Sequence, residues 1–249
     1  MFGWRRRIGY IAPTVMEVVP YDFYRFAPEG MGLVGVTCNI DDWRPEEFEK
    51  GLAQVATAAG YLGSRGVDYI IHGGGPLVVA RGKAFEEKIV AEIRRVSGVP
   101  ATTGVRAGME GLKAVGATRV AIASPYPPRH DEAMAGYLAG SGFDVVLTEG
   151  RDIGFKELQN VPPSEIYRFA RGVIERAKAK GVEALYMPCP QWQTAQTVDV
   201  LERDTGITVV AYAHATFYAA FKALGVSDRI VGHGRLLASL SACNLETGK

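Results

Sequence analysis

Apolar runs of strand length alternate along this chain with longer segments whose apolar positions recur at helical spacing. Such alternation is typical of α/β proteins, in which each strand of a parallel sheet is followed by a helix that returns the chain. Strands are expected near residues 7–12, 32–39, 68–72, 99–102, 119–124, 144–148, 184–188 and 207–212. Helices are expected near residues 45–64, 82–97, 104–115, 129–141, 163–179, 192–203 and 214–224.

The same pattern occurs twice. Residues 65–76 (RGVDYIIHGGGP) return as residues 180–191 (KGVEALYMPCPQ), so that Cys189 stands where Gly74 stood. Residues 7–14 match residues 119–126 in the same way, and both segments are strands that end at a proline. Matches in the same order at similar offsets indicate an internal duplication.

The fold class is therefore α/β, with two pseudo-symmetric doubly wound parallel-sheet halves. We expect a first half over residues 1–117, a second half over residues 118–225 and a C-terminal tail over residues 226–249, which could pack against the first half. Parallel sheets of this kind bind ligands at the carboxyl ends of their strands. The loops after four strands should then converge on one cleft between the halves.

Composition excludes several classes of partner. The 249 residues include 28 basic and 27 acidic side chains, so no bulk field favours nucleic acid or an anionic membrane. No window approaches the apolar length of a transmembrane helix. The cysteines at positions 38, 189 and 243 are an odd, widely spaced set, which indicates reduced thiols in a cytoplasmic protein and no zinc site. A small molecule is the expected partner, and the oligomeric state is left open.

Cys189 is the first candidate for chemistry. It lies between two prolines at a strand end, just before the helix expected at residues 192–203. Amides at a helix N-terminus would lower the pKa of the thiol and favour the thiolate. The alternative is a small buried side chain, which is how we interpret Cys38 in its apolar strand, as core or pocket lining. Cys243 in the tail carries no signal.

Tyr126 is the second candidate, because a phenol at a strand end can donate a hydrogen bond to a carboxylate or an enolate oxygen. Ser124 lies beside it, and Thr14 occupies the matching position in the first half. The glycines at positions 73–75 offer unobstructed backbone N–H groups to an anion. His72 precedes them and could orient a substrate, although a lone histidine at a strand end is more often structural.

These features resemble the aspartate/glutamate racemase superfamily, and within it the branch of maleate cis-trans isomerase and arylmalonate decarboxylase. The resemblance is carried by the duplicated halves, by residues 8–13, by the glycine loop with Arg81-Gly82 soon after, by residues 121–126 and by the strand that ends in Cys189. Racemases and isomerases of this superfamily have one cysteine in each half. The decarboxylase keeps only the second, which resembles the combination of Gly74 and Cys189 in this chain.

The resemblance implies that Cys189 and Tyr126 are catalytic and that no cofactor or metal is used. It implies a substrate-binding set that, with the residues of the matching strand ends, comprises Pro13, Thr14, Ile40, Trp43, Gly74, Gly75, Leu77, Ser124, Phe155 and Pro190. One departure concerns Gly75, Pro76 and Pro190, which stand where the decarboxylase has two hydroxyl residues and a glycine. Two donors are lost there, because proline has no N–H.

Three functions follow from these observations. The first is a cofactor-independent decarboxylase of a 2-substituted malonate-type acid, whose enediolate intermediate is protonated by a single cysteine. The second is a cofactor-independent racemase or cis-trans isomerase of a small carboxylic acid, with His72 as the second proton carrier. The third is a protein that binds a small acid on the same scaffold without catalysis.

Overall fold

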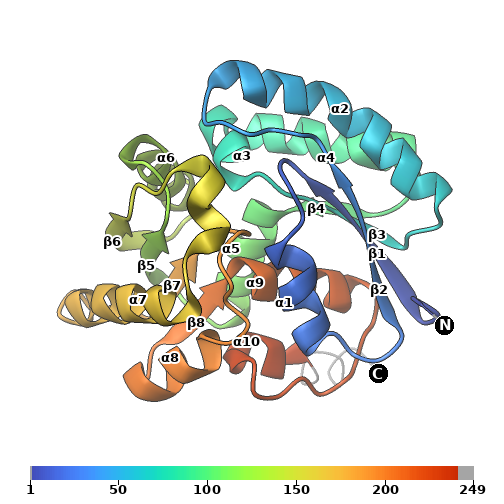
Figure 1. Ribbon diagram of the computed structural model, residues 1–249. Coiled ribbons are helices and arrows are strands. Elements are labelled where there is room, and N and C mark those ends of the chain that lie inside the picture. Colours follow the sequence, from blue (N-terminus) through green and yellow to red (C-terminus); the bar gives the residue numbers. More distant parts are fainter. Residues whose placement is uncertain (1, 241–249) are drawn as a thin grey trace.

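Two four-stranded parallel sheets form the framework of the computed structural model, which describes residues 2–240 (Figure 1). The first sheet has the order β2-β1-β3-β4 and the second the order β6-β5-β7-β8, so the two halves share one topology. The strands are β1 (Arg6–Ala12), β2 (Met31–Thr37), β3 (Tyr69–His72), β4 (Ala101–Thr103), β5 (Arg119–Ser124), β6 (Asp144–Gly150), β7 (Ala184–Met187) and β8 (Thr208–Ala211). The predicted fold class is confirmed.

Helices cover the sheets and contribute to the contact between the halves (Figure 1). They are α1 (Val18–Phe26), α2 (Pro45–Ser64), α3 (Gly75–Arg81), α4 (Lys83–Ser97), α5 (Gly104–Ala114), α6 (Pro128–Ala139), α7 (Pro163–Lys178), α8 (Val198–Thr205), α9 (Tyr212–Ala223) and α10 (Gly234–Ala238), with the 3₁₀ helix η1 at Phe155–Asn160. Every residue of the inner strands β3 and β7 is buried, as parallel strands covered on both faces require.

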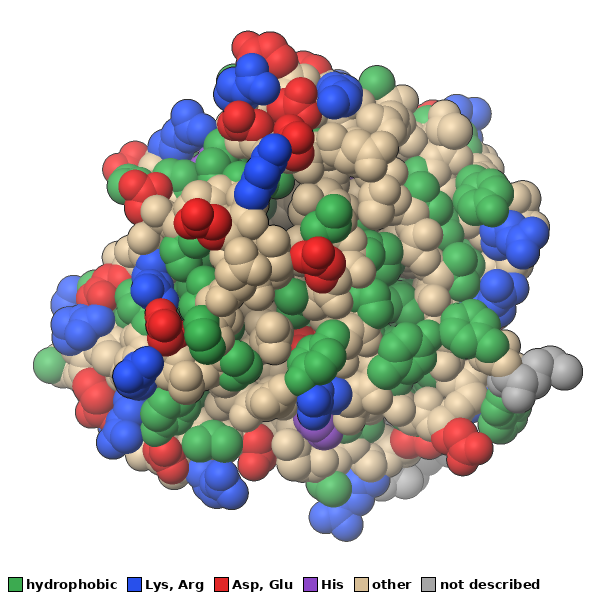
Figure 2. All heavy atoms as spheres, in the orientation of Figure 1, with side chains coloured by type: hydrophobic (Ala, Val, Ile, Leu, Met, Phe, Trp, Pro, Cys, Tyr) green, Lys and Arg blue, Asp and Glu red, His purple; other side chains and the backbone are tan. Residues whose placement is uncertain are grey.

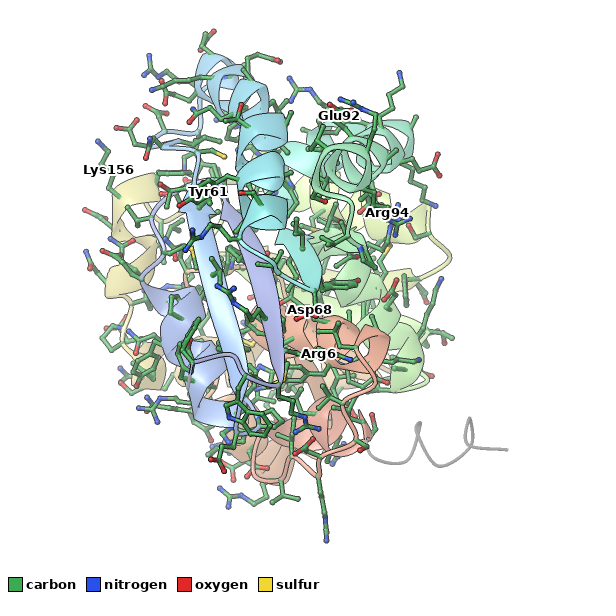
Figure 3. The ribbon with its side chains drawn as sticks, turned by 90° about the vertical axis from the view of Figure 1, so that its right-hand side faces the viewer. Arg6, Tyr61, Asp68, Glu92, Arg94 and Lys156 are labelled. Atoms are coloured by element: carbon green, nitrogen blue, oxygen red, sulfur yellow. The ribbon has the colours of Figure 1, made fainter. Side chains whose placement is uncertain are left out.

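The repeated basic-Gly-Val-acidic turn performs the same task in both halves. Asp68, just before β3, accepts a hydrogen bond of 2.7 Å from the Arg7 N–H at the start of β1. Glu183, just before β7, accepts one of 2.9 Å from the Arg119 N–H at the start of β5. Figure 3 shows Asp68 beside the neighbouring Arg6, with which it forms an ion pair of 3.8 Å. Each acid satisfies a strand-end amide, which explains why the motif occurs twice.

The two halves meet through aromatic side chains and small residues. Tyr10 of β1 and Tyr212 of α9 share a buried hydrogen bond of 2.8 Å between their hydroxyls. Helix α5 packs on α9, and a Cβ at Gly104 would overlap the Tyr212 ring. On the other side of α9, Phe23 of α1 lies 4.7 Å from Phe217, measured between ring centroids. The halves are therefore held by a buried interface.

Several elements differ from the sequence prediction. Helix α1, η1 and α10 were not expected, and the glycine loop runs directly into α3. The helix expected at residues 192–203 begins only at Val198. The intervening loop is held by side-chain contacts of the kind that periodicity does not reveal.

The tail begins on the second half. Helix α10 contacts β8, α8 and α9, while Asp228 forms an ion pair of 2.5 Å with Arg5 of the first half. Residues 241–249 lie outside the described residues, so the proposed division into 1–117, 118–225 and 226–249 stays a prediction.

Candidate active site

A cavity lies at the carboxyl ends of the strands, between the two halves. It offers about 40 Å³ to the centres of water-sized molecules. The lining residues are Pro13, Thr14, Ile40, Trp43, Phe48, Gly74, Gly75, Pro76, Leu77, Tyr126, Phe155, Leu158, Cys189, Pro190 and Gln191.

Eleven of the twelve residues predicted for the site line this cavity, and Ser124 does not. The Ser124 hydroxyl donates to the buried Asp131 carboxylate and accepts a hydrogen bond of 3.0 Å from the Tyr126 N–H. Ser124 therefore braces the turn that carries Tyr126. Prediction from sequence omitted Phe48, Pro76, Leu158 and Gln191 as site residues. Of these, Gln191 could have been found from the sequence, because it follows Cys189 by two positions in the same loop.

Gly74 forms the wall that belongs to the first half. Its backbone is left-handed, with φ 81° and ψ 53°, and it immediately precedes α3. The first amides of a helix have no acceptor within the helix, so the N–H groups of this turn are available to a ligand. Pro76 has no N–H to contribute. The donors on this wall are consequently backbone amides of Gly74, Gly75 and Leu77.

Cys189 lines the cavity from the second half and is buried, with 1% of its surface exposed. Burial raises the pKa of the thiol to about 12, because a thiolate is poorly solvated there. Hydrogen bonds from the Gln191 N–H, the Tyr126 hydroxyl and the Trp192 N–H lower the pKa of Cys189, with a smaller combined effect than burial. Cys189 is thus a neutral thiol at physiological pH.

The expectation of a thiolate at a helix N-terminus is therefore wrong. Helix α8 starts at Val198, nine positions after Cys189, and its amides are not among the groups that lower the pKa of the thiol. The loop amides of Gln191 and Trp192 approach the sulfur in their place. The resting group is an acid that carries its proton.

Tyr126 lies deep in the cavity, with 2% of its surface exposed. Its hydroxyl lies 3.2 Å from the Pro188 carbonyl oxygen and also within hydrogen-bonding reach of the Cys189 sulfur, so its one proton can serve either acceptor. Burial is the main reason why the pKa of Tyr126 lies well above its usual value, so the phenol keeps its proton. A ligand oxygen that accepts a hydrogen bond from the Tyr126 hydroxyl would take the place of the acceptors that the hydroxyl has in the protein.

Apolar side chains form one end of the cavity. Ile40, Phe48 and Leu77 pack together, with Trp43 and Phe155 against them. The Trp43 ring meets the Phe155 ring edge-on at 4.6 Å and the Tyr126 ring at 5.6 Å, measured between centroids. The described lining contains no lysine, arginine or histidine, although charges of both signs are spread over the surface in Figure 2. An acid bound here must be held by neutral donors.

His72 and Cys38 lie outside this lining. His72 is 2% exposed, and burial lowers the pKa of its imidazole to about 4, so the ring is neutral. Cys38 packs in the core between β1 and α2, and burial raises the pKa of its thiol to about 11. Cys243 falls outside the described residues. Cys189 and Tyr126 are the titratable side chains of the described lining.

The loop after Cys189 is anchored by the first half. Asp22 of α1 is 1% exposed, and its Oδ2 accepts hydrogen bonds of 3.0 Å from both the N–H and the hydroxyl of Thr194. Burial raises the pKa of the Asp22 carboxyl to about 6. A buried carboxylate with two donors from one residue fixes the loop midway between Cys189 and α8.

Neither a metal cluster nor a membrane helix is found in residues 2–240. No group of three or more His, Cys, Asp or Glu side chains there could hold a metal ion. No helix in that range is long and apolar enough to cross a membrane.

Comparison with known proteins agrees with this geometry. A family model described as arylmalonate decarboxylase matches residues 8–237. The chain belongs to this family. It is 28% identical over 239 residues to the arylmalonate decarboxylase of Bordetella bronchiseptica, a match that spans 92% of this chain and 95% of that enzyme.

A second group of relatives consists of isomerases. The chain is 31% identical over 160 residues to a maleate isomerase of Nocardia farcinica, which covers 63% of this chain and 62% of that enzyme. Among solved structures, a liganded arylmalonate decarboxylase variant superposes with a TM-score of 0.86 at 25% identity, over 93% of this chain and 98% of the other. The maleate isomerase of Pseudomonas putida S16 has the same TM-score at 22% identity and so shows the shared fold. The chain is thus an enzyme of the branch that holds both activities, and the resemblance predicted from sequence is confirmed.

Proposed function

We propose that this enzyme is a cofactor-independent decarboxylase of 2-substituted malonate-type acids and that Cys189 delivers one proton to an enediolate intermediate. The observation that carries the proposal is the asymmetry of the cavity. The second half contributes a protonated thiol to the lining, and the first half contributes Gly74, which has no side chain. One proton carrier on one face suffices for decarboxylation.

The reaction balances with the groups in the cavity. The bond between the α-carbon and one carboxylate breaks, carbon dioxide leaves, and the electron pair moves into the retained carboxylate as an enediolate. Cys189 then transfers its S–H proton to the α-carbon, and water returns a proton to the sulfur. Overall, one malonate dianion and one proton are converted into one monocarboxylate and one carbon dioxide.

Neutral donors would hold the retained carboxylate. Candidates are the N–H groups of Gly74 and Gly75 and the hydroxyls of Tyr126 and Thr14, all of which belong to lining residues. Donors placed where negative charge grows stabilise the transition state, and removing one typically costs about 2.7–4 kcal/mol. The pKa of Tyr126, raised mainly by burial, keeps this hydroxyl a donor at physiological pH.

The apolar end of the cavity would receive the leaving group. Ile40, Leu77 and Phe155 offer no hydrogen bond to a carboxylate, whereas they accommodate neutral carbon dioxide. The leaving carboxylate of the substrate is therefore less well stabilised there than neutral carbon dioxide, which favours decarboxylation.

A second candidate is a racemase or cis-trans isomerase, which the similarity to maleate isomerase favours. Exchange through opposite faces needs a proton carrier on each side. The first-half wall has Gly74 at the position matching Cys189, and His72 lies outside the described lining. This arrangement supports the decarboxylase over the isomerase, and over a binding protein that would need no acidic group at all.

The test is release of carbon dioxide from 2-methyl-2-phenylmalonate by the purified chain, with a chelator present and no added cofactor. We expect turnover, and we expect Cys189→Ser to lower it by several orders of magnitude because a hydroxyl is a much weaker acid than a thiol. Cys38→Ser is the matched control, since it removes a buried thiol outside the cavity lining. No release from a series of aryl and alkyl malonates would contradict the proposal and favour the isomerase.

A further inference from the structure

Gln191 presents a buried hydrogen-bond acceptor that the proposed reaction does not use. It lines the cavity, and 3% of its surface is exposed. Its Oε1 has no hydrogen-bond partner within residues 2–240. Leaving a buried acceptor unpaired costs free energy, so an unpaired atom on a residue that lines the cavity points to a donor supplied by the ligand.

The orientation of the Gln191 amide follows from its neighbours. Its Nε2 donates to the Val15 carbonyl, with 3.4 Å between the two atoms. A carbonyl oxygen can only accept, so the NH₂ group must face Val15 and the oxygen must face away from it. The Asp22–Thr194 contacts hold the same loop, and Pro190 restricts its backbone. The unpaired oxygen is therefore held in place before a ligand arrives.

A second lining residue also has an unpaired polar atom, and it has the opposite character. The indole Nε1 of Trp43, a donor, is buried without a partner in the described part of the chain. Trp43 comes from the first half and Gln191 from the second. A carboxylate can satisfy the indole, whereas at neutral pH it has no hydrogen to offer Gln191. The ligand needs a separate O–H or N–H group.

We propose that Gln191 is a specificity-determining residue, whose Oε1 accepts a hydrogen bond from a hydroxyl or amino group on the α-carbon of the acid. The α-carbon is the expected position because Gln191 follows Cys189 by two residues and both line one cavity. The preferred acids are then 2-hydroxy or 2-amino acids, not acids with purely hydrocarbon substituents. This substrate class rests on the proposed function for its reaction, while the binding preference holds for any acid in the cavity.

The test uses two acids of similar size that cannot lose a malonate carboxylate. Mandelate has a hydroxyl on its α-carbon, and 2-phenylpropionate has a methyl group there. The dissociation constant of each enantiomer is measured by calorimetry with the full chain. We expect the natural protein to bind mandelate about tenfold more tightly, the usual effect of a hydrogen bond that spares a buried acceptor.

Gln191→Met removes the amide oxygen at similar side-chain length. The affinity for mandelate divided by that for 2-phenylpropionate should then fall to about one or below, because a methyl group suits an apolar cavity better than a hydroxyl. Gln193→Met is the matched control, because Gln193 lies in the same loop outside the cavity lining. It should leave the tenfold ratio unchanged.

Three results would overturn the proposal: equal or tighter binding of 2-phenylpropionate by the natural protein, a hydroxyl preference that survives in Gln191→Met, or no binding of either acid at millimolar concentration. Neither acid is a malonate, so these results are independent of carbon dioxide release. Failure of the decarboxylase proposal would therefore be recognised separately.

Discussion

Gly74→Cys is the substitution that examines the cavity geometry most closely. It should place a second thiol opposite Cys189 and give the enzyme a proton carrier on each face of the bound acid. Space is available, because a Cβ at Gly74 would lie 3.5 Å from Pro13 Cγ and 3.7 Å from Leu77 Cβ, which are ordinary contacts. No neighbour has to move to admit the Cβ.

The expected cost comes from the backbone. Gly74 has φ 81°, a conformation that costs a residue with a side chain about 1–2 kcal/mol. For a chain of this length, 1 kcal/mol lowers the melting temperature by about 2–4 °C, so we expect a fall of roughly 2–8 °C and a folded protein. Gly74→Ala is the control, since it introduces the same strain without a thiol.

The assay follows optical purity and α-deuterium of one enantiomer of a 2-aryl acid in deuterated water. We expect Gly74→Cys to racemise the acid and incorporate deuterium, while the natural protein and Gly74→Ala do neither at a comparable rate. A folded Gly74→Cys variant without exchange would show that the two walls do not face one substrate. Rapid racemisation by the natural protein that His72→Ala abolishes would establish the racemase in place of the decarboxylase.

Three further predictions concern groups around the cavity. Burial raises the pKa of Cys189 to about 12, so its rate of alkylation by iodoacetamide should rise about tenfold per pH unit through pH 9–11. Mass spectrometry measures this rate, and a plateau below about pH 9 would contradict the prediction. Tyr126→Phe should lower kcat for carbon dioxide release by about 10²–10³ at unchanged melting temperature if the hydroxyl stabilises the enediolate, and unchanged kcat would remove it from the mechanism. Asp22→Ala deprives two Thr194 donors of their acceptor, so the free energy of unfolding, measured by denaturant titration, should fall by about 1–3 kcal/mol, and by less in Asp22→Asn. Equal stability of all three forms would show that the loop is held by other contacts.

The duplicated fold could be predicted because its causes are local. The turns that end in Asp68 and Glu183 satisfy strand-end amides in both halves, so the same short pattern had to appear twice. The site loops follow from this, because parallel strands bring their carboxyl ends to one edge. The sequence therefore suffices to assign Cys189, Tyr126 and Gly74 to one cavity.

Other features depend on contacts between distant residues. The loop after Cys189 stays irregular up to Val198, and Asp22 of the other half holds it at Thr194, a contact that no local pattern shows. Ser124 looked like a ligand-binding hydroxyl, but it is already paired with Asp131. Helix α1 was missed although Val19, Asp22, Phe23 and Phe26 recur at helical spacing on its buried face. The helical pattern is present in the sequence there, but it spans only nine residues.

The central claim is that one proton reaches the α-carbon from one side, from Cys189. It is tested most directly by supplying 2-methyl-2-phenylmalonate in deuterated water and determining the handedness and deuterium content of the 2-phenylpropionate formed. The account predicts carbon dioxide in equal amount to product, one deuterium on every α-carbon, a single enantiomer, and loss of this activity in Cys189→Ser. A racemic product, or undiminished formation of one enantiomer by Cys189→Ser, would contradict it.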